Sequence, residues 1–145
     1  MDIIETTLTS SILDRLVGWF KPARTKSDKD LGNLGENLVC RYLKKLRLAL
    51  LARNYMVSGG EVDIIALDGK TIVFIEVKTR IVDDVPAEAS VDREKQRRIT
   101  LAARQYLKRK DAESLPTRFD VIAVIDPSSS HPRLRHRRRA FEPVY

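Results

Sequence analysis

The chain has 145 residues, of which 43% are hydrophobic and 32% are charged. This length suits one domain, and the balance of apolar and charged residues excludes wholesale disorder. Lysine and arginine number 27 against 20 aspartates and glutamates, so the formal net charge is +7. That excess favours an anionic partner, with nucleic acid ahead of a membrane surface. The single cysteine, Cys40, excludes an internal disulfide framework and a cysteine-based zinc site.

Residues 1–26 are predicted to form an N-terminal helix and a linker. Within residues 3–20, apolar side chains recur at three- or four-residue steps, which is typical of an amphipathic helix, and Pro22 ends it. Such a helix packs on the domain or on a partner; a membrane-surface role is the weaker alternative, because its polar face has few lysines and arginines. No apolar stretch is long enough to span a bilayer, and the N-terminus does not resemble a signal peptide. We therefore expect a cytoplasmic protein without stable membrane insertion.

A second helix is predicted over residues 27–46, where apolar side chains form one arc at about 100° per residue. Gly35 lies near the middle of this arc, where a missing side chain lets a helix lie close to what it covers. Glu36 lies just beyond the arc, so its carboxylate can reach over the rim of the covered surface. Cys40 falls on the polar side of the same helix.

Strands are predicted next in the chain, over residues 50–57, 61–67 and 70–80, with a turn or bend at 58–60. Residues 89–110 then have helical periodicity, and they are followed by a strand over 118–125 and a candidate last strand over 134–141. This order predicts an α/β or α+β domain, with helices flanking one central sheet.

The Asp68-Gly69 pair predicts a two-residue hairpin turn with Leu67 opposite Lys70. In that register Glu61 faces Glu76, and Asp63 faces Phe74. Side chains alternate along a strand, so one face of the sheet gathers a lysine and the three acids that we call the carboxylate patch. The lysine is Lys78, and the carboxylate patch consists of Glu61, Asp63 and Glu76.

Like charges gathered in this way destabilise a sheet and raise one another's pKa unless a cation compensates them. Hard divalent cations such as Mg²⁺ or Mn²⁺ prefer oxygen ligands, and they often take one or two carboxylates together with waters and a substrate phosphate. Lys78 can orient the attacking water or stabilise charge on the phosphate. On an exposed strand, Glu76 and Lys78 would be merely solvated charges, but they lie in an apolar run typical of a covered strand. The pattern therefore favours metal-assisted phosphodiester hydrolysis.

The helix predicted at 89–110 carries Lys95 at the centre of an apolar stripe, with Gln96 beside it. Two interpretations stay open. The ammonium group of Lys95 can snorkel past its neighbours to solvent. Alternatively, Lys95 and Gln96 reach towards the carboxylate patch or the phosphate beside it.

The last 19 residues carry five basic side chains and one acidic side chain, and residues 131–139 hold five arginines and two histidines. In an extended segment, alternate arginines share one face and could contact phosphates without reading base sequence. The alternative is a charged strand edge that discourages aggregation. The predicted nucleic-acid contacts are Arg80, Arg133, Arg135, Arg137, Arg138 and Arg139. A metal role for His131 and His136 is not expected, because no carboxylate or cysteine accompanies them at ligand spacing. Asp120 is expected to be a structural partner of an arginine.

Three motifs together resemble the PD-(D/E)xK restriction-endonuclease-like superfamily: Gly35-Glu36, Gly60-Glu61-Val62-Asp63 and Glu76-Val77-Lys78. With residues 95–99, 102–103, 106–107, 118–121 and 140–141, they resemble more narrowly the YraN-like family of small bacterial proteins, over about residues 30–142. This resemblance implies a restriction-endonuclease-like α/β core over residues 27–142, with a central mixed sheet of four to five strands flanked by helices. It implies Asp63, Glu76 and Lys78 as catalytic residues, and Glu36, Asp63 and Glu76 as metal ligands. Val62 stands where the superfamily pattern has a proline.

The expected function is therefore that of a Mg²⁺- or Mn²⁺-dependent endonuclease acting on DNA, with branched or otherwise structured DNA as one candidate substrate. Glu61, Lys95 and Gln96 are candidate accessory residues, and no small-molecule cofactor is expected. One alternative is a non-catalytic nucleic-acid-binding module that keeps the nuclease fold. Another is a scaffold recruited through residues 3–20. Cutting two strands would favour a two-fold homodimer.

Overall fold

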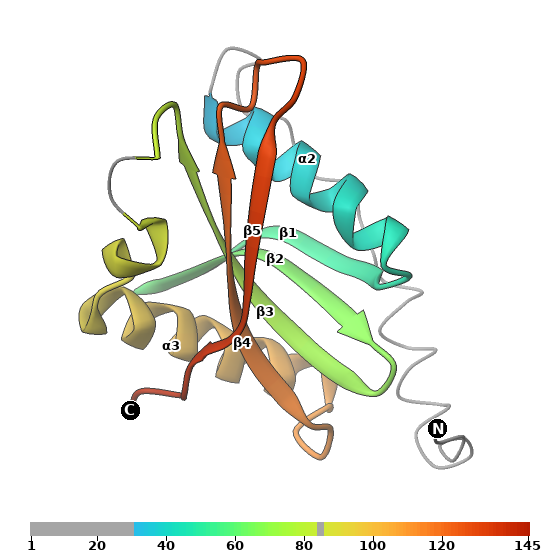
Figure 1. The fold of residues 1–145 in the computed structure, drawn as a ribbon. Coiled ribbons are helices and arrows are strands. Elements are labelled where there is room, and N and C mark those ends of the chain that lie inside the picture. Colours follow the sequence, from blue (N-terminus) through green and yellow to red (C-terminus); the bar gives the residue numbers. More distant parts are fainter. Residues whose placement is uncertain (1–30, 84–85) are drawn as a thin grey trace.

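The computed structural model of the chain describes residues 31–83 and 86–145. The helix predicted at 3–20, its linker and the start of the next helix lie outside the described residues. In the described part, two long helices flank a five-stranded sheet with strand order β1-β2-β3-β4-β5 (Figure 1). Strands β3 and β4 pair in parallel and the other neighbours are antiparallel. The predicted α/β fold with a mixed central sheet flanked by helices is confirmed.

The predicted elements occur with small shifts at their ends. The helical elements are α2 (Leu31–Lys45), the short 3₁₀ helix η1 (Ala87–Ser90) and α3 (Arg93–Lys110). The strands are β1 (Ala49–Val57), β2 (Gly60–Asp68), β3 (Thr71–Arg80), β4 (Thr117–Ile125) and β5 (Arg133–Phe141). The helix predicted over 89–110 divides into η1 and α3 because Asp92 caps α3, accepting a hydrogen bond of 2.8 Å from the Lys95 N–H. None of the described helices is long and apolar enough to cross a membrane.

Each face of the sheet has its own apolar layer. The helices α2 and α3 lie on opposite sides of the sheet (Figure 1). Helix α3 packs mainly on β2, and α2 packs on β3, β1 and β4. The placement of Cys40 on a polar helix face is wrong, because its side chain is buried in the layer under α2. Since α2 contacts β1 as well as the two central strands, its covered arc is wide enough to include this residue.

The predicted register of the β2–β3 hairpin is wrong by two residues. Leu67 pairs with Ile72 and Asp68 with Thr71, so Gly69 and Lys70 form the turn. Gly69 has φ +64°, the left-handed conformation that a tight hairpin requires at its first central position. Continuing this register places Asp63 opposite Glu76. A shift by two residues by itself leaves every side chain on its original face. The alternation along β2 is interrupted, however, because Val62 is buried in the layer of Ile65 and Leu67 whereas Ile64 is buried in the opposite layer. The meeting of Asp63 with Glu76 therefore rests on their contacts and not on strand period.

Two glycines allow the helices to approach the sheet closely on its two faces. A Cβ atom on Gly35 of α2 would overlap the Thr79 side chain of β3. A Cβ atom on Gly60 of β2 would overlap the Arg98 carbonyl oxygen of α3 and lie 3.2 Å from the Ala102 nitrogen. The prediction that Gly35 permits a close helix contact is confirmed. The two glycines directly precede Glu36 and Glu61, so they control how each helix lies beside these acids.

Gly60→Ala is expected to lower the free energy of unfolding by about 1–3 kcal/mol, because the atoms in its way belong to the rigid backbone of α3. Urea denaturation measures this loss. Gly69→Asn is the control: nothing lies within 4 Å of an added Cβ there, and asparagine tolerates a positive φ. Equal stability of the Gly60→Ala variant and the wild type would contradict the close packing of α3 on β2.

Candidate metal and active site

Asp63 and Glu76 meet where strands β2 and β3 separate. The backbone pairing of these strands ends at Ile64 and Ile75. Beyond that point the Val77 N–H donates to Oδ2 of Asp63 at 2.8 Å, so the carboxylate takes the place of a backbone acceptor. Glu76 is buried, with 5% of its surface exposed. The structure thus brings together the two acids that the motif spacing singled out.

The pKa of Glu76 responds to its burial and to the neighbouring Asp63. Burial, and then the charge and hydrogen bond of Asp63, raise the pKa of Glu76 to about 8. The positive charges of Lys95 and Lys78 act in the opposite direction but do not outweigh them. A stronger local cation would favour the ionised form of Glu76 beside Asp63.

Lys95 reaches the carboxylate patch from the first turn of α3. Its Nζ lies 2.9 Å from Oε1 of Glu61 and 3.5 Å from Oε2 of Glu76. Burial would lower the pKa of Lys95, but the hydrogen bond to Glu61 and the charges of the patch raise it overall. Of the two interpretations of Lys95, the structure shows contact with the patch. The Gln96 side chain instead donates to the Val91 carbonyl at 3.0 Å, a contact at the start of the helix.

Glu36 faces the patch from α2. Its Oε2 accepts a hydrogen bond of 3.3 Å from Arg53, whose other terminal nitrogen donates to Asn37 at 2.8 Å. Burial and the charge of Asp63 raise the pKa of Glu36, and Arg53 partly offsets this. The carboxyl groups of Glu36 and Asp63 therefore influence one another, although Glu36 already has a cationic partner.

The donor set fits a divalent cation held by two carboxylates. Asp63 and Glu76 supply adjacent oxygen ligands whose mutual repulsion a cation would relieve. Within residues 31–83 and 86–145, no three acidic, histidine or cysteine side chains are close enough together to hold a metal ion. Two carboxylates, with waters and a substrate phosphate, is a common arrangement for Mg²⁺. Glu36 stays a predicted third ligand, which in this arrangement is paired with Arg53.

Strand β5 aligns three arginines with residues of β3, and we call them the arginine row: Arg133, Arg135 and Arg137. Strand β4 pairs with both β3 and β5, so a β3 residue and a β5 residue that pair with the same β4 residue lie in one line across the sheet. In this way Arg135 lines up with Lys78, Arg137 with Glu76, and Arg133 with Arg80. Residues paired in register share a face, so these arginines lie on the face of Lys78, two strands or about 10 Å away. All three are exposed. The arginine row therefore borders the candidate site.

The predicted alternation of arginines ends at Arg137. The register between β4 and β5 changes there, and Arg139 has φ +51°. Its N–H donates to Oδ1 of Asp120 at 3.1 Å, which bends the strand out of regular pairing. The prediction that Arg139 continues the same regular row is therefore wrong. Arg138 and Arg139 remain exposed beyond the row.

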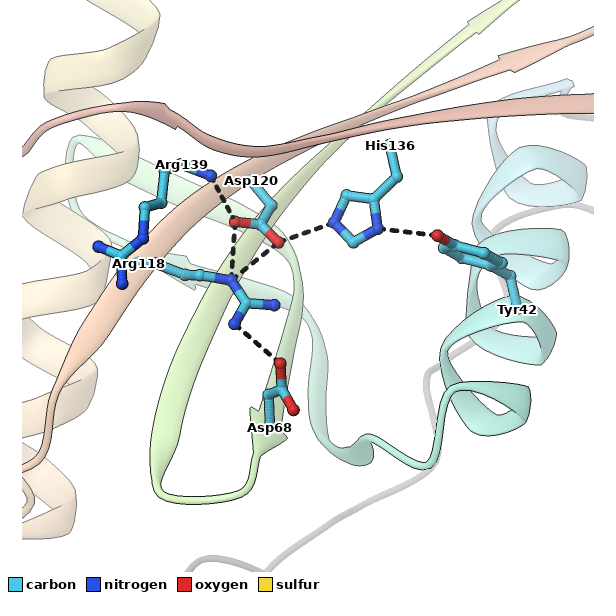
Figure 2. Close-up of polar contacts among 6 residues, drawn as sticks. All are labelled: Tyr42, Asp68, Arg118, Asp120, His136 and Arg139. Atoms are coloured by element: carbon cyan, nitrogen blue, oxygen red, sulfur yellow. Dashed lines mark hydrogen bonds and ion pairs between the residues drawn. The ribbon is translucent and has the colours of Figure 1, made fainter. Parts of the chain in front are cut away.

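A second polar cluster, buried between α2 and the sheet, lies around Asp120 (Figure 2). Asp120 is fully buried and accepts hydrogen bonds from Nε of Arg118 at 3.1 Å and from His136 at 2.8 Å. His136 also contacts the Tyr42 hydroxyl at 3.0 Å. Arg118 in turn donates to Asp68 at 2.8 Å, which ties the β2–β3 hairpin to the cluster.

The interpretation of Asp120 as an arginine partner is confirmed. Burial alone would raise its pKa, but the hydrogen bonds from His136 and the Arg139 N–H, with the charge of Arg118, lower it. The statement that no carboxylate accompanies His136 holds for the sequence but is wrong for the fold, because β4 and β5 bring Asp120 to it. The sequence reasoning missed Tyr42 as well, since it lies 94 residues from His136 in the chain.

A surface hollow of about 540 Å³ follows the exposed side of α3, away from the patch. It is lined by Leu101, Arg104, Gln105, Leu107, Lys108 and Glu113. None of these residues belongs to the carboxylate patch or the arginine row. The candidate site is thus defined by its carboxyl groups and their cations rather than by this hollow.

A mixed sheet flanked by helices, with an aspartate and a Glu-x-Lys motif on adjoining strand ends, is consistent with the restriction-endonuclease-like class of protein. The chain belongs to the uncharacterised protein family UPF0102, the YraN family of that superfamily, whose family model matches residues 35–124. The suspected resemblance is confirmed.

Relatives from several bacteria match most of the chain. A UPF0102 protein of Geotalea uraniireducens is 45% identical over 119 residues, covering 81% of this chain and 94% of the relative. One from Geobacter sulfurreducens is 47% identical over 81% of this chain and 93% of its own length. A UPF0102 protein of Rhodococcus opacus is 42% identical, over 77% of this chain and 95% of the relative.

Proposed function

We propose that this protein is a metal-dependent nuclease that hydrolyses phosphodiester bonds in DNA. The observation that carries this proposal is the contact between the carboxyl groups of Asp63 and Glu76 in a protein of net charge +7, with Lys78 close enough to influence Glu76. Burying two such groups together is costly unless a cation joins them. Membership of the restriction-endonuclease-like superfamily agrees with this proposal. A fold alone does not assign a function, so the site residues carry it.

Asp63 and Glu76 would hold the Mg²⁺ or Mn²⁺ ion, which when bound would activate a water molecule and polarise the phosphate. Lys78 lies two residues beyond Glu76 and faces the same side of the sheet as the arginine row. Its ammonium group would stabilise the negative charge that develops on the phosphate during attack. The burial of Glu76 keeps competing water away from one side of the pair.

The arginine row would hold the DNA backbone. Arg133, Arg135 and Arg137 lie about 10 Å from the rows of Arg80, Lys78 and Glu76, on the same face. Contacts from arginine to phosphate position a duplex or a single strand without reading its bases. Substrate choice, including a preference for branched DNA, would then depend on the shape of the backbone.

The test is cleavage of duplex, single-stranded, nicked and four-way-junction DNA by the purified protein. Cleavage of at least one form is expected with Mn²⁺ or Mg²⁺ and not with EDTA. Asp63→Asn should reduce the rate about a hundredfold or more, because it removes one ligand charge while its amide oxygen can still accept from the Val77 N–H.

Glu113→Gln is the control, since it removes an exposed carboxylate outside the patch and should leave the rate unchanged. Wild-type protein that binds DNA but cleaves none of the four forms with either metal would contradict the proposal. That result would favour the non-catalytic binding module instead.

A further inference from the structure

Lys95 occupies a place beside the carboxylate patch that a bound cation would also favour. Its Nζ spans Glu61 and Glu76, at 2.9 and 3.5 Å. Glu76 is one of the two acids assigned to the metal, so Lys95 and the ion would share a carboxyl group. The contact with Glu76 is the longer of the two, and it is the one that a metal ion would replace.

The position of Lys95 is built into the fold. Asp92 caps its backbone N–H at 2.8 Å, and Gly60 lets α3 lie directly against β2. The Lys95 side chain is only 20% exposed. The cap fixes the first turn of α3, and the glycine contact fixes the distance of α3 from β2. Together they determine where the Lys95 side chain begins. The ammonium group is thus delivered to the patch by two independent packing features.

Charge balance makes the ion and Lys95 competitors. The three carboxylates of the patch, when ionised, and the two ammonium groups of Lys78 and Lys95 sum to a local charge of −1. A divalent ion added to this group gives +1, so each cation weakens the hold of the other on Glu76. Removing the Lys95 charge changes the local charge of the metal-free site from −1 to −2 and so strengthens its attraction for the ion.

We propose that Lys95 is a tethered counter-cation, which pairs with Glu61 and Glu76 while no divalent ion is bound and is displaced from Glu76 when the ion binds. This inference rests on the proposed function, because it assumes that Asp63 and Glu76 are the metal ligands. It adds a specific role: Lys95 lets the acids be packed together in the metal-free protein and reduces metal affinity in return. By linkage, the ion loosens the Lys95 contact as much as Lys95 weakens the ion.

The experiment measures Mn²⁺ binding by titration calorimetry, without DNA, for the wild type and for Lys95→Met. The variant is expected to bind Mn²⁺ about tenfold more tightly. In EDTA its melting temperature should fall below that of the wild type, because Glu61 and Glu76 lose their contacts with the Lys95 ammonium group. Saturating Mn²⁺ should raise the melting temperature of the variant more than that of the wild type.

Lys108→Met is the matched control, an exposed lysine on the same helix about 20 Å further along. It should change neither Mn²⁺ affinity nor the metal-dependent shift in melting temperature. Should Lys95→Met not fold, Lys95→Gln removes the charge and keeps a hydrogen-bond donor, with the same expectations. Mn²⁺ affinity equal to or weaker than that of the wild type in the folded variant would overturn the inference.

The two proposals can fail separately, because one is measured by metal affinity and the other by DNA cleavage. Metal-dependent cleavage with unchanged Mn²⁺ affinity in Lys95→Met would refute the counter-cation role and leave the nuclease intact. Tighter Mn²⁺ binding in the variant, with no cleavage by the wild type, would support the counter-cation role and refute the nuclease. Absence of Mn²⁺ binding in both proteins would overturn the counter-cation role, whatever the cleavage result.

Discussion

Lys78→Met is expected to lower the rate of DNA cleavage about a hundred- to a thousandfold, while Mn²⁺ binds at least as tightly as in the wild type. Lys78 is near enough to Glu76 to lower the pKa of that carboxyl group. Its positive charge therefore slightly opposes the binding of a second cation, yet it is well placed to stabilise a phosphate that is gaining negative charge. Loss of the ammonium group should thus affect the reaction and spare the metal.

Single-turnover cleavage and Mn²⁺ calorimetry on the same preparation separate these two effects. Lys70→Met serves as the control, because Lys70 is exposed in the β2–β3 turn at the far end of the hairpin from the site. Its cleavage rate should match that of the wild type. Equal rates for Lys78→Met and the wild type would show that Lys78 is not a catalytic residue. The role of the metal ligands would then depend on the Asp63→Asn variant alone.

Asp120→Asn is expected to lower the free energy of unfolding by about 3–5 kcal/mol. Donors from Arg118, His136 and the Arg139 backbone converge on this fully buried carboxylate. Asparagine has one acceptor oxygen, and its NH₂ group would face donors. The variant would also leave the charge of Arg118 buried with only Asp68 to offset it. Chemical denaturation monitored by circular dichroism measures the loss.

The same carboxylate predicts how stability responds to acid. The pKa of Asp120 is lowered in the folded protein relative to an unfolded value of about 3.9. Its contribution is therefore complete above that unfolded value, and it is lost as pH falls through the lower folded value. The stability difference between the wild type and Asp120→Asn should shrink over this acidic range.

Asp83→Asn provides the comparison, because Asp83 pairs with Arg135 at the surface, at 3.0 Å, where solvent screens the interaction. It should reduce stability much less than Asp120→Asn does. Similar losses of unfolding free energy for the two variants would mean that the buried cluster stabilises the protein no more than a surface ion pair does. A pH-independent gap between the wild type and Asp120→Asn would contradict the lowered pKa.

Some residues of the candidate site could be predicted from patterns between near neighbours in the chain. Others are brought to the site only by contacts between distant parts of the chain. The period of a strand alone predicts Asp63, Glu76 and Lys78 on one face, and an error of two residues in the hairpin register does not change that prediction. Strand β2 departs from this period, because Val62 and Ile64 lie in opposite apolar layers. The contact of Lys95 with Glu61 joins residues 34 apart in the chain. From the sequence, a lysine reaching the patch and a lysine snorkelling to solvent looked equally reasonable.

The sequence by itself determined the α/β order of elements, the shared face of Glu76 and Lys78 on β3, and the glycine at which α2 approaches the sheet closely. These depend on side-chain periodicity and backbone sterics, which act between near neighbours in the chain. Only the tertiary structure decided the cluster of Tyr42, Asp120 and His136, the row of arginines beside Lys78, and the burial of Cys40. Those contacts arise from the order and register of β3, β4 and β5 and from how α2 crosses them, which no local pattern specifies.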